Sequence, residues 1–221
     1  MKVNLISHSQ GPNTSLGDIE SALDLVAYCA RVSNPSNQTN KETNEKLVKY
    51  LMKHKHWSPL EMVSVCLEIE TTRDIARQIL RHRSFSFQEF SQRYADPTKD
   101  LEFEIREARL QDPKNRQNSI EIYYFLLHIC PSMLQQKVID TAVEAYDFAI
   151  SRGIAKEQAR AVLPEGNTKS RLYVNGTLRS WIHYIELRES NGTQLEHIEI
   201  AKAVAKVIHE IFPLTLQNDN V

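Results

Sequence analysis

The feature that most limits the fold of this chain is an alternating segment, MVSVCLEIE, at residues 62–70. Val63, Val65, Leu67 and Ile69 fall on one side of an extended backbone, and mostly polar residues fall between them. This period of two predicts a β-strand with one buried face. The segment that follows, TRDIARQILRHR, has helical spacing over about residues 72–83. The chain must therefore combine a sheet with helices.

The remaining periodicities predict a chain that is richer in helix than in strand. Short strands are expected at KVNLIS (2–7) and at RLYVNG (171–176), the second ending in an Asn-Gly turn. Helices are expected at 19–31, at 155–162, and from a Thr177 cap to about Arg188. Three more are expected to begin at capping boxes: one from Thr39/Glu42 to about Lys53, one from Ser132/Gln135 to Gly153, and one from Thr193/Glu196 to a point before Pro213. Residues 95–118 are polar and irregular and are expected to cross the surface, toward a ligand. The simplest account is one mixed α+β domain over residues 1–221.

Composition excludes several classes of protein. The six glycines form neither a G-x-G-x-x-G fingerprint nor a Walker loop, which argues against a Rossmann dehydrogenase or a P-loop kinase. A bound phosphate would therefore be held by side chains. The net charge of −1 disfavours a dedicated nucleic-acid binder. The three cysteines lack metal-ligand spacing, no signal peptide begins the chain, and no apolar run is long enough to span a membrane, so we expect a cytosolic protein without disulfides.

Arginines crowd the helix predicted at 72–83. Arg73, Arg77 and Arg81 recur every four residues and so lie along one stripe. One interpretation is a surface face whose acidic partners come from elsewhere in the chain. The other is a site for a phosphate or carboxylate, because guanidinium groups match those anions with two hydrogen bonds.

The next segment, SFSFQEFSQRY, adds polar groups beside these arginines. If it is extended, Glu89, Ser91 and Arg93 point to one side. A carboxylate, a hydroxyl and a guanidinium would then form a wall suited to a phosphorylated small molecule. Gln78 and Ser91 would contact its sugar or base. Packing in the core is the favoured interpretation of the phenylalanines at 85, 87 and 90.

These residues resemble a known family. Arg81-His82-Arg83, followed after seven residues by Ser91, is similar to the signature of the flavin-dependent thymidylate synthases. The segments ARVSN (30–34), HKHWSPLE (54–61), EQARAVLP (157–164) and LRSWIHYIELR (178–188) are similar to other blocks of the family, in the same order. The resemblance implies conversion of dUMP to dTMP with methylenetetrahydrofolate as one-carbon donor and with FAD reduced by NADPH. It also implies a homotetramer with active sites shared between subunits, and a fold of helices packed around a small, mainly antiparallel sheet.

The resemblance also assigns site residues. It implies that Arg188 is catalytic, because a fixed positive charge stabilises the electron-rich pyrimidine ring that attacks the methylene group. It implies contacts to dUMP from Gln78, Arg81, Glu89, Phe90, Ser91, Gln92, Arg93, Arg160 and Arg188. It implies contacts to FAD from Ser33, His56, Ser58, Glu61, Arg81, His82, Arg83, Glu89, Thr177, Arg179 and His183.

Some of these residues have a second interpretation. Arg160 also suits a cation at a helix C-terminus, and His56 a histidine at a helix end. A metal site at His54 and His56 lacks further ligands with fitting spacing, so none is expected. Ser91 has no sequence-placed His-Asp pair to activate it, so we interpret it as a hydroxyl that positions substrate.

The chain departs from the common family pattern at three positions. Thr177 and His183 stand where many members have Asn, and Gly192 stands where many have His. Thr177 suits a helix cap, and His183 has the hydrogen-bonding capacity to replace an amide. Two alternative functions remain open from the residues. One is a nucleic-acid-binding module that uses the arginine-rich helix, and the other is a flavin or nucleotide binder without catalysis.

Overall fold

The computed structural model describes residues 1–11, 19–123 and 125–214. At its centre is a four-stranded sheet in the order β1-β2-β6-β3, in which each neighbouring pair is antiparallel. These strands are β1 (Lys2–His8), β2 (Ser64–Thr72), β6 (Lys169–Thr177) and β3 (Ser86–Glu89). A separate hairpin joins β4 (Arg109–Gln111) to β5 (Ser119–Glu121). The predicted α+β fold with a small antiparallel sheet is confirmed.

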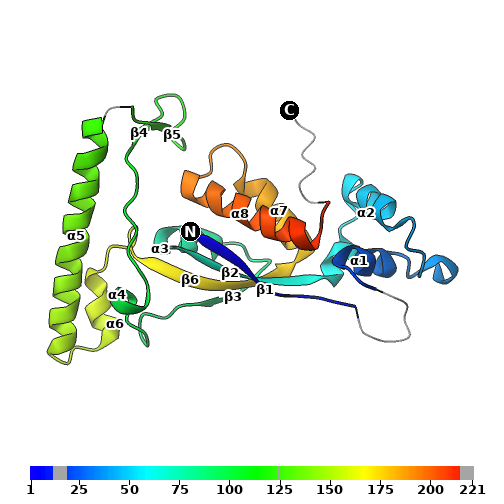
Figure 1. The fold of residues 1–221 in the computed structure, drawn as a ribbon, viewed down its shortest axis with the longest axis horizontal. Helices are drawn as coiled ribbons and strands as arrows, with labels where there is room; N and C mark the ends of the chain where they lie inside the picture. The colour runs from blue at the N-terminus through cyan, green and yellow to red at the C-terminus, as the bar shows by residue number, and fades with distance from the viewer. Residues whose placement is uncertain (12–18, 124, 215–221) are drawn as a thin grey trace.

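The helices divide into three groups around the sheet (Figure 1). Two long helices cover one of its faces, α7 (Leu178–Arg188) and α8 (Leu195–Ile211). A second group lies at one end of the elongated molecule and contains α1 (Ala22–Ala30) and α2 (Asn44–Lys53). The third lies at the opposite end and contains α4 (Pro97–Asp100), α5 (Phe125–Ser151) and α6 (Lys156–Ala159). The short α3 (Arg73–Ile79) follows β2 directly, and 3₁₀ turns occupy Pro35–Asn37, Ser58–Met62 and Arg160–Val162.

The core lies between the sheet and helices α7 and α8. Val63, Val65, Leu67 and Ile69 are at most 1% exposed, so the alternation of residues 62–70 correctly identified the buried face. Trp181 of α7 packs in the same cluster, and its Nε1 donates to the Val65 carbonyl over 3.0 Å. Burial of these apolar side chains is the main force that holds α7 on the sheet.

The predicted Asn-Gly turn at the end of residues 171–176 is wrong. Strand β6 runs through Asn175 and Gly176 to Thr177, and Asn175 pairs with both Cys66 and Ser86. Gly176 serves close packing instead, since a Cβ there would lie 2.3 Å from the ring of Phe85. An Asn-Gly pair therefore signals a tight approach here and not a turn.

All three predicted capping boxes are wrong. Helix α2 begins at Asn44, after the predicted start, and α5 begins at Phe125, before it. Helix α8 begins at Leu195 without a side-chain cap. The polar residues make tertiary contacts instead. Arg31 donates to Thr43 Oγ1 over 2.9 Å and to Asn44, while Gln135 exchanges two 2.9 Å bonds with the backbone of Arg106.

The predicted helix over 72–83 and the extended wall over 85–94 are both shorter than expected. Helix α3 ends at Ile79, and turns follow, in which His82 N bonds to the Ile79 carbonyl over 3.0 Å. Strand β3 ends at Glu89, and the chain turns where Tyr94 N bonds to the Ser91 carbonyl over 3.1 Å. Residues Ser91 and Arg93 therefore do not continue one wall from Glu89.

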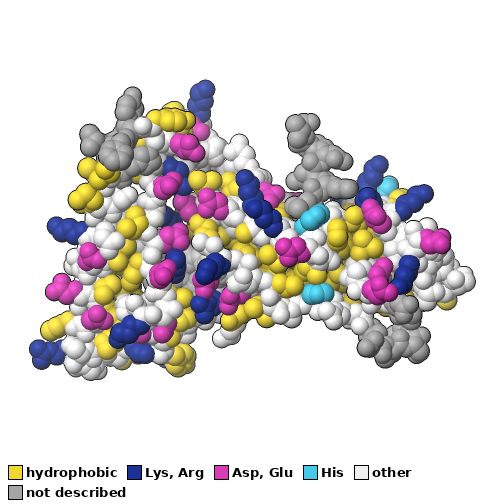
Figure 2. Space-filling view, viewed as in Figure 1, with side chains coloured by type: hydrophobic (Ala, Val, Ile, Leu, Met, Phe, Trp, Pro, Cys, Tyr) yellow, Lys and Arg dark blue, Asp and Glu magenta, His cyan; other side chains and the backbone are white. Residues whose placement is uncertain are grey.

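Helix α5 presents apolar side chains to the surface. Met133, Leu134, Val138 and Phe148 are 54–66% exposed. Figure 2 shows such side chains reaching the surface along α5, at the left of the view. In the part of the chain that the structure describes, no helix is both long and apolar enough to cross a membrane.

Candidate active site

A pocket rich in arginine lies between α3, α6 and the turn after β3. We call it the arginine pocket. It has a volume of about 270 Å³ and is lined by Arg73, Arg77, Gln92, Glu157, Arg160, Ala161, Leu163 and Glu165. Gln92 is 3% exposed, and within the described ranges its buried Nε2 has no hydrogen-bond partner. An unpaired buried donor beside three guanidinium groups fits a pocket that binds an anion.

Acidic residues in and beside the arginine pocket neutralise the charge of its arginines only in part. Glu89 Oε1 lies 3.7 Å from Arg73 and Oε2 lies 3.8 Å from Arg77, while Ser170 Oγ donates to Glu89 over 2.9 Å. Arg77 Nε also lies 3.1 Å from Glu165. Burial, opposed by Glu89 and aided by neighbouring guanidinium groups, lowers the pKa of Arg73 below its ordinary value. An incoming phosphate would relieve that excess of positive charge.

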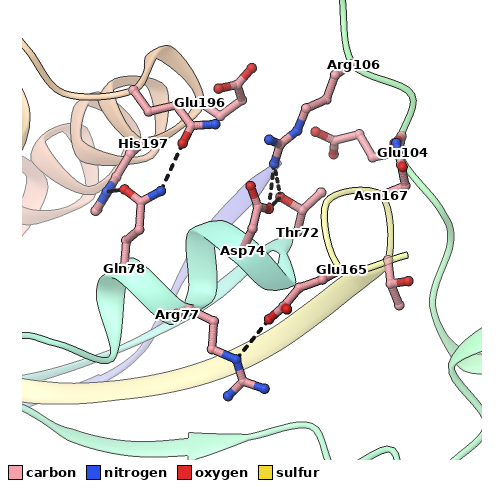
Figure 3. Close-up of polar contacts among 12 residues, drawn as sticks. Thr72, Asp74, Arg77, Gln78, Glu104, Arg106, Glu165, Asn167, Glu196 and His197 are labelled. Carbon is pink, nitrogen blue, oxygen red and sulfur yellow. Dashed lines mark hydrogen bonds and ion pairs between the residues drawn. The ribbon is translucent and has the colours of Figure 1, made fainter. Parts of the chain in front are cut away.

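A second polar group lies on the other side of α3. Figure 3 shows Arg77 and Gln78 leaving the helix in opposite directions, Arg77 toward Glu165 and Gln78 toward His197. Gln78 Nε2 donates to Gln194 Oε1 over 2.9 Å, and Gln78 Oε1 lies 3.2 Å from His197 Nδ1. Neighbouring residues of a helix point about 100° apart, which lets α3 serve two groups at once.

Arg188, predicted to be catalytic, lies at the end of α7 beside His82. Its Nε donates to His82 Nε2 over 2.9 Å. Burial, and then the Arg188 charge, lower the pKa of His82 to about 4, so the ring is a neutral acceptor near pH 7. Across the residues described, no ion pair joins Arg188 to an acid. Its positive charge is therefore held in place without being neutralised.

Some of the residues predicted to contact FAD form a third region, around α7 and the 3₁₀ turn at Ser58–Met62, whereas Glu89 and His82 belong to the two groups described above. Arg179 is paired with Glu61, yet its buried Nε lacks a hydrogen-bond partner among the residues described. Arg81 and Arg83 are exposed, and neither has an acidic partner in the described part of the chain. Cationic groups with spare donors fit the diphosphate of FAD. Ser33 lies apart, in a cavity of about 500 Å³ between α1 and α2, and His56 lies at the end of α2 near the rings of Tyr50 and His54.

The structure explains two of the three departures from the family pattern. Thr177 caps α7 as predicted, because its Oγ1 accepts from Ser180 N over 3.3 Å. Gly192 has φ +91°, a backbone conformation that side chains with a Cβ rarely adopt, so the turn favours glycine at this position. His183 packs edge-on against Trp57, with ring centroids 4.9 Å apart.

Sequence reasoning missed several members of these groups. Arg73 and Arg77 were recognised as anion-binding candidates but were not assigned to the site, and they line the same pocket as Arg160 and Gln92. His197 had no recognisable signal, since only the position of α8 beside α3 and α7 brings it to Gln78. The three arginines of the predicted stripe also separate, because Arg81 lies beyond the end of α3.

Comparison with known proteins assigns the family. Residues 16–214 match the family model described as "Thymidylate synthase complementing protein". The chain is 48% identical over 195 residues to a "Probable flavin-dependent thymidylate synthase" of Paramecium bursaria Chlorella virus 1, a match that covers 88% of this chain and 89% of the relative. It is also 46% identical over 213 residues to the "Flavin-dependent thymidylate synthase" of Synechocystis, with 96% of each chain covered.

The chain belongs to the flavin-dependent thymidylate synthase family. It is therefore an enzyme, a flavin-dependent methyltransferase that forms dTMP from dUMP. Among solved structures, it is similar to the UMP/dUMP methylase PolB from Streptomyces cacaoi bound with 5-Br dUMP, with a TM-score of 0.78, 25% identity, and coverage of 97% of this chain and 92% of the other. The resemblance that the sequence motifs indicated is confirmed, and the roles of individual residues stay predictions.

Proposed function

We propose that this flavin-dependent thymidylate synthase takes its one-carbon unit from methylenetetrahydrofolate and its hydride from FAD that NADPH has reduced. The observation that carries the assignment of dUMP is the arginine pocket. Three arginines and the unpaired Nε2 of Gln92 meet in a space of about 270 Å³. We assign this pocket to the phosphate of dUMP, with Arg160 and Gln92 as its ligands and Arg73 and Arg77 as additional cations. Gln78, Arg81, Glu89, Phe90, Ser91 and Arg93 complete the proposed contacts to the nucleotide.

Arg188 has the environment that its proposed catalytic role requires. The pyrimidine ring becomes anionic as its carbon attacks the methylene group, and a charge placed in advance stabilises that state. His82 is a neutral hydrogen-bond acceptor that orients the Arg188 guanidinium. The full positive charge of Arg188 therefore remains available to the pyrimidine ring. Bound FAD would supply the hydride that completes the methyl group, with Arg179, Arg81, Arg83 and His183 among the residues that hold it.

Ser91 is proposed to position substrate and not to attack it. Its Oγ accepts from the backbone N of Arg93 over 3.4 Å, and the described residues place no histidine against it. A serine without a base is a weak nucleophile. We expect Ser91→Ala to slow dTMP formation while leaving some of it. Complete loss of dTMP formation with intact dUMP and FAD binding would contradict this role.

We also propose that the active site is shared between chains of a homotetramer. The arginine pocket and Gln78 lie on different sides of α3 (Figure 3), so one molecule of dUMP would reach both groups most simply if they came from different chains. The exposed apolar side chains of α5 are consistent with contacts between chains.

The function is tested by colour and by tritium release. The purified protein should carry flavin absorbance that bleaches under NADPH without oxygen. With dUMP tritiated at the carbon that receives the methyl group, it should release tritium only when methylenetetrahydrofolate is present. A protein that takes up no FAD would contradict the assignment, and flavin bleaching without tritium release would indicate a binder without catalysis.

A further inference from the structure

Gln78 is held at both ends of its carboxamide by residues that the site prediction did not include. Its Nε2 donates to Gln194 Oε1 over 2.9 Å, and its Oε1 lies 3.2 Å from His197 Nδ1. On the far side of the ring, His197 Nε2 lies 3.0 Å from the hydroxyl of Tyr184. His197 is 0% exposed and Tyr184 is 1% exposed, so water does not compete for these bonds. We call this series, from Gln194 through Gln78 and His197 to Tyr184, the Gln78 chain.

A hydrogen-bonded series of this type has two self-consistent directions. A carboxamide can exchange its oxygen and nitrogen by rotation, and a neutral imidazole can carry its proton on either nitrogen. In one direction His197 donates to Gln78, and in the other Gln78 donates to His197. The two directions present opposite ends of the Gln78 carboxamide to a ligand. The substrate would therefore meet a mixture of the two orientations unless a group outside this hydrogen-bonded series selects one of them.

The Glu196 carboxylate makes that selection. Arg109 Nη2 lies 2.5 Å from Glu196 Oε1 in an ion pair that is largely buried. Although burial acts in the opposite sense, the pKa of Glu196 is lowered by hydrogen bonds from its own backbone N–H, from Arg109 and from the Gln194 side chain. An ionised carboxylate only accepts. The Gln194 side chain lies beside this carboxylate, which favours its amide nitrogen on the Glu196 side and its oxygen toward Gln78, although Glu196 Oε2 has no hydrogen-bond partner among the described residues.

The remaining bonds then follow in order. The Gln194 oxygen requires a donor, so Gln78 presents Nε2 to it and Oε1 to His197. The Gln78 oxygen in turn requires the proton of His197 on Nδ1, and Tyr184 donates to the bare Nε2. Burial, and then the charges of Arg188 and His82, lower the pKa of His197 to about 3, so the ring stays neutral and this pattern persists across the working pH range.

We propose that His197 is a positioning residue for dUMP, whose Nδ1–H fixes the orientation of the Gln78 carboxamide. This inference rests on the proposed contact between Gln78 and dUMP. Fixed in this way, Gln78 keeps one N–H and one lone pair of its oxygen for the nucleotide. Removing the Nδ1 donor frees the carboxamide to rotate, and dUMP then has to order it on binding.

The test compares three variants that differ in where they place a donor. In His197→Asn the amide nitrogen can occupy the place of Nδ1, whereas in His197→Gln the amide lies near the place of Nε2, toward Tyr184. His197→Leu has neither group. The dissociation constant of dUMP is measured on the FAD-loaded enzyme, with thermal unfolding as a control for structure. We expect His197→Asn to stay within about twofold of the parent, and His197→Gln and His197→Leu to bind dUMP about fivefold to tenfold more weakly, the loss expected for one hydrogen bond.

Two further variants separate this inference from the proposed function. Gln78→Ala should weaken dUMP binding at least as much as His197→Leu, and Gln194→Met should weaken it by disordering Gln78 from the other end. If Gln78→Ala leaves dUMP binding unchanged, the assignment of Gln78 to the nucleotide is wrong. If Gln78→Ala weakens binding but all three His197 variants bind alike, whether tightly or weakly, the positioning role of His197 is overturned.

Discussion

Arg188 is the residue on which the proposed chemistry depends most directly. Its guanidinium donates to His82 and is paired with no acid among the residues described. Replacing it by alanine should lower kcat about 10²- to 10³-fold, the loss typical of a preorganised charge in an active site. The kcat of Arg188→Lys should lie between those of the parent and the alanine variant, because lysine keeps the charge but loses the planar donor to His82. Steady-state kinetics check this, with flavin content as the control. Equal activity of the alanine variant and the parent would contradict the role.

The two buried histidines predict how stability depends on pH. An unfolded histidine titrates near pH 6.5, whereas the pKa is about 4 for His82 and about 3 for His197 in the folded protein. Between these values the unfolded chain binds more protons, so stability falls as pH falls from about 7 to about 4. The slope is at most about 1.4 kcal/mol per pH unit for each proton, and less for His82, which is only half-buried.

Chemical denaturation at several pH values measures this slope. His197→Asn removes one of the two titrating groups and should make the dependence shallower between pH 7 and 5. A slope that is unchanged in this variant would show that His197 does not remain neutral in the folded protein.

For individual residues, the sequence predicted which residue types form the candidate site but not which of them pair with one another. The motif from Arg81 to Ser91 indicated the family correctly, and the nucleotide site at this motif stays a prediction. Its geometry was wrong beyond Glu89, because the bond from Tyr94 N to the Ser91 carbonyl turns the chain where an extended strand was expected. His197 was invisible to sequence reasoning, since a histidine inside an amphipathic helix has no local pattern that reveals its partners on α3 and α7.

The β4–β5 hairpin is the element that connects the irregular region 95–118 to the site. Arg109 pairs with Glu196 of α8, and Asn118 Nδ2 donates to Asn191 Oδ1 over 3.1 Å. The hairpin also approaches Gly192 so closely that a Cβ would contact Gln117. It therefore braces the start of α8, which supplies Gln194 and His197 to the Gln78 chain.

Removing one partner of the Arg109–Glu196 pair tests this brace. Arg109→Met leaves a carboxylate buried without its cation and should lower the free energy of unfolding by about 3 kcal/mol. Arg109→Met/Glu196→Leu should recover much of that loss, because an apolar pair replaces the ion pair. Urea denaturation provides the measurement. A cost below about 0.5 kcal/mol for Arg109→Met would mean that the pair is solvated and that the hairpin does not brace α8.

The sequence predicted helices better than it predicted their starts. The ends at Lys53, near Gly153, at Arg188 and before Pro213 agree with the structure, since glycine and proline stop helices locally. In two of the three capping boxes the acidic or amide residue is used in a tertiary contact instead, as Gln135 is against Arg106 and Glu196 against Arg109. Local hydrogen-bond patterns cannot distinguish these two uses.

For the whole molecule, the proposed sharing of active sites predicts complementation. Arg188→Ala removes the group on the Gln78 side of α3, and Arg160→Ala removes one from the arginine pocket. Each variant alone should be nearly inactive. If every site takes one half from each of two chains, an equal mixture that is unfolded and reassembled should regain about a quarter of the parent activity. Activity that stays at the level of the separate variants would show that both halves come from one chain.

One consequence of the two faces of α3 concerns insertions and deletions. Arg77 and Gln78 are consecutive residues, yet they point toward different groups (Figure 3). Adding or removing one residue within α3 would rotate everything after it by about 100°, moving both side chains off their partners together. The length of α3 should therefore be constant among active relatives. Aligned lengths alone would test this consequence.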